Sequence, residues 1–87
     1  DYQGAQAQLL SMEQTYPDDY RVYMKLALLE CVIQGNLSEN ARNYSQADAW
    51  YQKAEQYYAG VRNSGKSDDE MQELENVIQE LKNKGWL

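Results

Sequence analysis

A single proline, Pro17, stands between two stretches that each carry the apolar spacing of an α-helix. Proline disfavours helical geometry in the residue before it, so the first helix should end near Thr15. The next residues, Asp18 and Asp19, can cap a second helix and complement its dipole. The sequence therefore predicts a corner between two helices at Pro17, and this corner limits the chain to helices that fold back on one another.

Apolar residues recur every three or four positions along four segments, which is the period of an amphipathic helix. We expect helices at about 2–15, 19–34, 44–62 and 67–84. Gly35 and Asn36 tolerate left-handed backbone and should end the second helix. Ser67 begins a capping-box pattern at the start of the fourth helix. No segment shows the alternation of a strand, so we expect an all-α fold of about four antiparallel helices.

Size and charge narrow the class of protein. Eighty-seven residues suffice for one small domain, so residues 1–87 are expected to form a single unit. Fourteen acidic and eight basic residues give a net charge of −6, which disfavours nucleic acids and anionic membranes because phosphate binding requires a basic face. The chain begins with Asp1, shows no signal peptide and has one cysteine, Cys31. We therefore expect a cytoplasmic fragment of a longer protein.

Residues that carry catalysis or bind cofactors are scarce. Histidine is absent, which removes the Ser-His-Asp and Cys-His schemes. Cys31 falls on an apolar side of its helix, where a thiol is usually inert. The acidic residues of 68–75 open a helix, where carboxylates serve the dipole rather than a cation. No glycine-rich phosphate loop occurs. We expect no enzyme activity, no metal and no cofactor.

The first and third helical segments share a pattern of side-chain size. The first carries a small, a large and a medium side chain at positions i, i+4 and i+7, namely Ala5, Leu9 and Met12. The third repeats the pattern 42 positions later with Ala47, Tyr51 and Ala54. Small residues let two helix backbones approach closely, so Ala47 and Ala54 should lie where the third helix crosses the second.

This arrangement resembles the tetratricopeptide repeat, a helix–turn–helix unit of about 34 residues. Four residues fall on the family's small, large, small and boundary-proline positions: Ala5, Leu9, Met12 and Pro17. Glu30 stands where a tyrosine is usual, and Ala59 replaces the next boundary proline. About eight extra residues are needed between the second and third helices to keep the spacing. The resemblance implies a short α–α superhelix that binds proteins or peptides.

Three segments also look like the helical repeat regions that follow the catalytic domain in some bacterial Ser/Thr protein kinases. They are YPDDYRVYMKLALLE, YQKAEQYY and the terminal KGWL. Two functions remain open on these resemblances. The first is a scaffold module that docks a peptide or partner helix, and the second is a regulatory domain of a larger enzyme that acts by intramolecular docking. More repeats upstream favour the first, and kinase motifs upstream favour the second.

Candidate partner-binding residues follow from the repeat resemblance and from the aromatic residues. Arg21 and Lys25 match positions that line the family's concave groove, where basic residues can grip a ligand carboxylate. A solvated pair that balances the neighbouring aspartates is the alternative. Met24 and Leu28 also fall on groove positions, unless the last helix covers them. The candidate set is Arg21, Lys25, Met24, Leu28, Trp50 and Tyr57.

The third helix carries more aromatic side chains than one face can bury. Trp50 and Tyr57 belong to this set, and core packing is the alternative to a partner-binding face. The first helix should leave an apolar flank exposed, which invites weak homodimerisation of the isolated chain or reflects truncation. At the other end, Gly85 should break the fourth helix. Trp86 is then expected to fold back onto the groove between the third and fourth helices.

Overall fold

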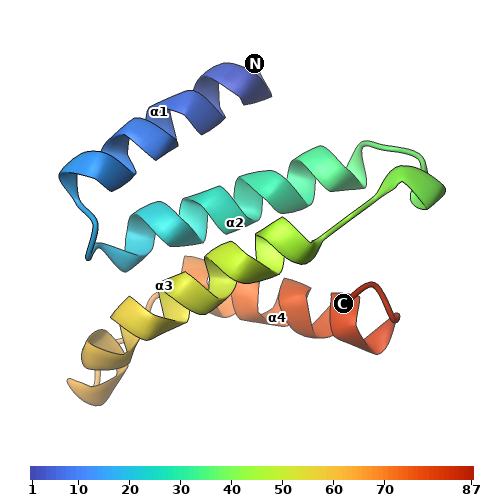
Figure 1. The fold of residues 1–87 in the computed structure, drawn as a ribbon. Helices are drawn as coiled ribbons and strands as arrows, with labels where there is room; N and C mark the ends of the chain where they lie inside the picture. The colour runs from blue at the N-terminus through green and yellow to red at the C-terminus, as the bar shows by residue number, and fades with distance from the viewer.

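The computed structural model describes residues 1–87 and consists of four α-helices that run in alternating directions (Figure 1). They are α1 (Tyr2–Thr15), α2 (Tyr20–Gly35), α3 (Ser45–Asn63) and α4 (Asp69–Asn83), with a short 3₁₀ turn, η1 (Glu39–Ala41), between α2 and α3. The predicted all-α fold is confirmed, and the predicted helix ends lie within two residues of the observed ones. None of the helices combines the length and apolar surface that a membrane span requires.

The corner at Pro17 is confirmed and is attached to the start of α2. Asp19 caps this helix, because its Oδ1 accepts a hydrogen bond from the N–H of Arg21 at 3.0 Å. The carbonyl of Pro17 accepts a hydrogen bond from the hydroxyl of Tyr23, one turn into α2. These two bonds tie the corner to α2, while the N–H of Tyr16 donates to the carbonyl of Met12 in α1 at 2.8 Å.

The end of α2 differs from the prediction. Gly35 belongs to the helix and Asn36 stays right-handed with φ −84°, so the predicted left-handed termination is wrong. Arg42, from the following loop, provides the partners instead. Its Nη2 donates to the carbonyl of Gly35 at 3.1 Å, and its Nε donates to the carbonyl of Leu37 at 2.9 Å. A distant cation thus replaces the local turn, because it satisfies the last carbonyls and complements the helix dipole.

The start of α4 is tied to α2 and α3 through Asp68, which caps the helix in place of the predicted Ser67. Oδ1 of Asp68 accepts from the second and third N–H groups of α4, and Oδ2 accepts from the hydroxyl of Tyr20 at 2.5 Å. The N–H of Asp68 donates to the hydroxyl of Tyr58 at 2.9 Å. Burial and the bond to Asp68 raise the pKa of Tyr20 to about 12. A carboxylate is favoured over a serine because its two oxygens accept the bonds from Tyr20 and from both N–H groups of α4 at once.

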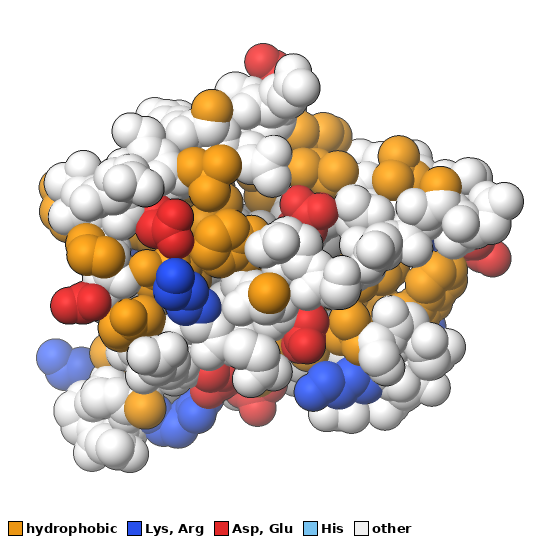
Figure 2. Space-filling model, viewed as in Figure 1, with side chains coloured by type: hydrophobic (Ala, Val, Ile, Leu, Met, Phe, Trp, Pro, Cys, Tyr) orange, Lys and Arg blue, Asp and Glu red, His pale blue; other side chains and the backbone are white.

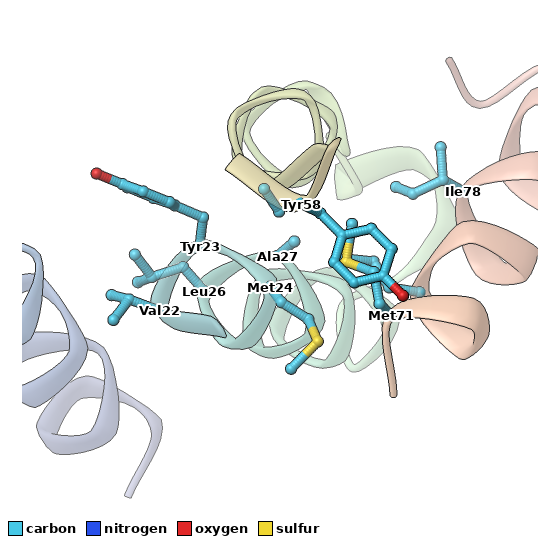
Figure 3. Close-up of a cluster of buried hydrophobic side chains, with 10 residues drawn as sticks. Val22, Tyr23, Met24, Leu26, Ala27, Tyr58, Met71 and Ile78 are labelled. Atoms are coloured by element: carbon cyan, nitrogen blue, oxygen red, sulfur yellow. The ribbon is translucent and has the colours of Figure 1, made fainter. Parts of the chain in front are cut away.

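The core lies between α2, α3 and α4, and α1 contributes no fully buried side chain (Figure 3). Its ten residues are Val22, Tyr23, Met24, Leu26, Ala27, Ala54, Tyr58, Met71, Leu74 and Ile78. The most extensive helix contact joins α2 to α3. Ala47 and Ala54 are both fully buried, which agrees with the close crossing predicted for them.

The predicted apolar stripe of α1 is largely outside the protein interior. Leu9 is partly buried, but Ala5 is exposed and Met12 is 39% exposed. Figure 2 shows apolar side chains exposed on the side of the molecule where α1 lies. Gln6 and Glu13 are the other partly buried residues of α1. Helix α1 is therefore rotated about its axis, so that its most apolar face does not point directly into the protein interior.

Polar groups of the neighbouring helices account for this rotation. Glu30 of α2 is only 8% exposed and accepts hydrogen bonds from Gln6 at 3.4 Å and from Gln34 at 3.0 Å. Glu13 pairs with Lys53 of α3 at 3.6 Å. A buried carboxylate without partners is costly, so α1 turns its glutamine towards Glu30 rather than its alanine or methionine.

The chain folds back after α4. Gly85 adopts φ +79°, and the N–H of Trp86 donates to the carbonyl of Leu81 at 2.8 Å, which forms a Schellman motif. The partly buried ring of Trp86 packs edge-on against Tyr44, with ring centroids 5.8 Å apart. The guanidinium of Arg42 lies 5.8 Å from the same ring. Trp86 therefore folds back as predicted, and its ring meets Tyr44 at the start of α3 and Arg42 in the loop before it.

Candidate partner-binding groove

An open groove of about 500 Å³ lies where the C-terminal part of α1 meets the start of α2. Its lining comes from both helices and from the corner between them: Leu9, Met12, Tyr16, Asp19, Arg21, Val22 and Lys25. The three residues from α1 and its end are spaced i, i+3 and i+7, so they follow one flank of the helix. Val22 is 2% exposed and forms part of the floor, whereas Met12 and Tyr16 are 39% and 55% exposed.

The two basic residues of the groove are in different electrostatic states. Arg21 makes two hydrogen bonds to Asp19, at 3.0 and 2.8 Å, and they hold the pKa of this carboxyl below its usual range. Lys25 has only a long ion pair to Glu70, at 3.7 Å, between two side chains that are about half exposed. Such a pair contributes at most about 1 kcal/mol. Lys25 is therefore the more available cation for a ligand carboxylate.

The structure separates the six residues proposed from the sequence. Arg21 and Lys25 lie together at the groove. Met24 is 1% exposed within the core, and Leu28 packs partly buried against that core, so neither reaches the groove. Helix α2 is covered by α1, α3 and α4, which explains why apolar residues around most of its circumference are enclosed. The interpretation of Met24 as a partner contact is not compatible with its burial.

Trp50 and Tyr57 of α3 lie elsewhere, on the ring of Tyr23. Their ring centroids are 6.0 and 5.6 Å from that of Tyr23, in nearly parallel stacks. Lys53 lies between them in sequence, with its Nζ 5.0 Å from the centre of the same ring. Both aromatic residues are half-buried, so core packing accounts for most of their surface.

Tyr57 also borders a second, shallower depression around the corner at Pro17. This depression shares Tyr16, Asp19 and Arg21 with the groove, so the corner forms a ridge between the two hollows. Sequence reasoning missed Met12 and Tyr16 as surface residues of the site. Their spacing from Leu9 contained the signal, but the same spacing also predicts a core stripe. Only the rotation of α1 about its axis shows whether this spacing forms a core stripe or a surface stripe.

The side chains in and near the groove provide binding contacts rather than an activated nucleophile. Burial, followed by the nearby charge of Glu30, raises the pKa of the Cys31 thiol to about 11, which keeps it protonated at neutral pH. The groove itself offers apolar surface, two cations and one carboxylate. No protein-family model, curated protein or solved structure significantly matches the chain.

Proposed function

We propose that this chain is a non-catalytic protein-interaction module of the tetratricopeptide-repeat type, which docks a peptide or partner helix in the groove between α1 and α2. The observation that supports this function most directly is the exposed apolar lining of the groove. Met12 and Tyr16 stand beside a floor that includes Val22. Apolar side chains gathered around a hollow, with a few charged groups at its edge, are typical of binding sites.

The charges at the groove favour a partner with one well-placed carboxylate. Lys25 is held only by its long pair to Glu70, so a ligand carboxylate can replace that partner at little cost. Arg21 already binds Asp19 and contributes less. The net charge of −6 repels acidic partners elsewhere on the surface. We therefore expect an apolar peptide whose acidic residue lies next to Lys25.

Two features of the fold support the repeat type. Ala47 and Ala54 are fully buried in α3, the helix that has the largest contact with α2. Pro17 lies at the corner that would form the boundary between repeats. On this proposal α2 and α3 form one repeat, α1 is the second helix of the preceding repeat, and α4 follows as the next helix.

The test is a selection of random peptides displayed on phage against the 87-residue chain, followed by fluorescence anisotropy with the selected peptides. Met12→Glu should weaken binding by at least about tenfold, because it puts a charge into the apolar lining. Leu10→Glu is the matched control, since Leu10 is on the same helix and equally exposed at 39% but does not line the groove. It should change affinity by less than about twofold.

Lys25→Glu tests the expected contact with a carboxylate of the peptide. It should lower the affinity for peptides that carry an acidic residue and leave the affinity for neutral peptides unchanged. Equal binding to the Met12→Glu and Leu10→Glu variants would contradict the groove as the docking site, and so would a selection that enriches no peptide.

A further inference from the structure

We propose that α1 is an exchangeable helix through which two copies of this chain form a dimer. In the dimer, α1 of each copy occupies the seat on α2 of the other copy, while each chain keeps its own three-helix body of α2, α3 and α4. The seat is the side of α2 that α1 covers in the single chain. This inference goes beyond peptide docking, since the partner is a second copy of the chain and the contact lies beneath α1.

The attachment of α1 is the first observation behind this proposal. No side chain of α1 is fully buried, and Leu9 is its only partly buried large apolar residue. Its hydrogen bonds and ion pair to the body are those of Gln6 with Glu30 at 3.4 Å, Glu13 with Lys53 at 3.6 Å, and Tyr2, whose hydroxyl accepts from Asn36 at 3.0 Å. Two of these are long and the third is exposed, so each contributes little. Release of α1 therefore costs far less than opening the body.

The seat on α2, however, requires an occupant. Val22 and Leu26 are 2% exposed, and Figure 3 shows both on the side of α2 that faces α1. Departure of α1 uncovers these apolar side chains and removes Gln6 from the largely buried Glu30. An α1 from a second copy restores every one of these contacts, because the same residues meet the same seat.

The connection between α1 and α2 suits an exchange. It consists of residues 16–19. The Asp19 cap and the hydroxyl of Tyr23 on the carbonyl of Pro17 tie it to α2, and its backbone bond to α1 is the one from the N–H of Tyr16 to the carbonyl of Met12 at 2.8 Å. Pro17 keeps α1 and α2 from merging into one continuous helix, since proline removes a helical hydrogen bond and clashes with the preceding turn. Rotation at a few backbone angles near Tyr16 then redirects α1 as a unit. Exchange of an element through a short hinge is a low-cost route to dimers.

Charge favours a second copy on this side of the molecule. The chain carries a net charge of −6, so two copies repel each other over most orientations. Glu13 is the only charged side chain of α1, and it is paired with Lys53. Two chains that approach through their α1 helices keep their strongly acidic α4 helices apart. Helix α1, with its single and paired charge, is therefore the surface where self-association meets the least repulsion.

Cross-linking between two single-cysteine variants tests the exchange. In a Cys31→Ala background, one preparation carries Glu13→Cys and the other Lys53→Cys. These positions face each other across the α1–α3 contact and keep part of their side chains exposed. The preparations are mixed at high concentration and treated with a short bismaleimide. We expect a covalent heterodimer joined between residues 13 and 53, with a yield that rises with concentration, as measured by denaturing gel and mass spectrometry.

A matched control and a second measurement make the outcome decisive. Ala59→Cys replaces Lys53→Cys as the control, because Ala59 is exposed on the same helix but, six residues from Lys53, is not on the side that pairs with Glu13. It should give no heterodimer above background. Sedimentation of the unmodified chain should show a dimer fraction that increases with concentration. A dimer without the 13–53 link, or equal links at positions 53 and 59, would mean association without exchange and would overturn the proposal. A strictly monomeric chain would overturn it too, and monomeric peptide binding in the groove would then remain unaffected.

Discussion

The two sides of α2 are packed in different ways. Towards α3 and α4, α2 shares most of a core of ten buried side chains, and Asp68 ties the three helices together through two tyrosines. Towards α1, the buried Val22 and Leu26 of α2 meet a helix with one partly buried leucine, and a few polar contacts complete the attachment. Both sides arise from helices with the same apolar period. The comparison shows that this period makes a helix amphipathic, whereas the depth of its packing depends on what the neighbouring helix presents.

This difference in packing also bears on where the proposed partner would dock. The body is closed around its core, and Met24, which the sequence suggested as a partner contact, belongs to that closed part. The contact between α1 and α2 is incompletely filled and leaves the groove with Met12 and Tyr16 at the surface. Binding is therefore expected on the loosely packed side, because apolar surface remains exposed there.

The largest expected effect comes from comparing the two sides of α2 through the same substitution, leucine to alanine. Leu74→Ala removes a side chain that is fully buried in α4, and we expect it to lower the free energy of unfolding by about 2–5 kcal/mol. Leu9→Ala removes the only partly buried leucine of α1, with an expected loss of about 1 kcal/mol. Urea unfolding measures both. Equal losses would show that α1 is packed as firmly as the body.

The close crossing of α2 and α3 gives the second prediction. Ala54→Leu inserts three carbon atoms where the side chain is fully buried, and it should destabilise the fold by about 1–3 kcal/mol through overpacking. Ala59→Leu, on the exposed surface of the same helix, should stay within about 0.5 kcal/mol. Thermal unfolding compares the two variants. An unchanged melting temperature for Ala54→Leu would contradict the tight packing of the body.

The bonds around Asp68 give the third prediction. Asp68→Ala removes the cap of α4 and the partner of the Tyr20 hydroxyl, with an expected loss of about 1–2 kcal/mol at neutral pH. The hydrogen bond from Tyr20, followed by those from the N–H groups of Met71 and Glu70, holds the pKa of Asp68 below its ordinary 3.8. A lowered pKa adds stability above the unfolded-state value, and this stability is lost as pH falls through the folded-state value.

The difference between the wild type and Asp68→Ala should therefore shrink in acid. Asp68→Asn is the control, since an amide oxygen can still cap the helix but carries no charge. At neutral pH, Asp68→Asn should keep part of the free energy of unfolding that Asp68→Ala loses. Unlike the wild type, it should not lose stability through protonation of residue 68 as the pH falls. A gap between wild type and Asp68→Ala that does not change with pH would contradict a role for the ionised carboxylate.

The smallest expected effect concerns the far end of the body. Trp86→Ala should lower the free energy of unfolding by about 1 kcal/mol, because the indole packs on Tyr44 and lies next to Arg42. In a Trp50→Phe background, Trp86 alone reports by fluorescence. Its emission should lie to the blue of free tryptophan and move to the red after Arg42→Ala. If the folded chain had the emission maximum of a fully solvent-exposed tryptophan, Trp86 would not be packed on the body.

Local chemistry made much of the helical layout predictable. Proline and its two following aspartates marked the corner, because proline limits the preceding backbone and aspartate satisfies free N–H groups. Ala47 and Ala54 were predicted at a close crossing of α2 and α3, because small side chains allow a close approach, and both are fully buried. Within the candidate site, Arg21 and Lys25 were proposed from the repeat resemblance, which puts them on groove-lining positions, and both line the groove between α1 and α2.

Contacts between distant residues decided the rest. Gln6 of α1 is bonded to the buried Glu30 of α2, and in this rotation of α1 Met12 lies at the surface, as does Tyr16 just after the helix. Arg42 ends α2 from the following loop, where the local residues predicted a left-handed turn. By itself the sequence determined where helices form and which of their faces are apolar, since these depend on neighbouring residues. Only the tertiary structure decided which apolar faces are covered, because burial depends on the shape and hydrogen-bonding groups of helices that are remote in the chain.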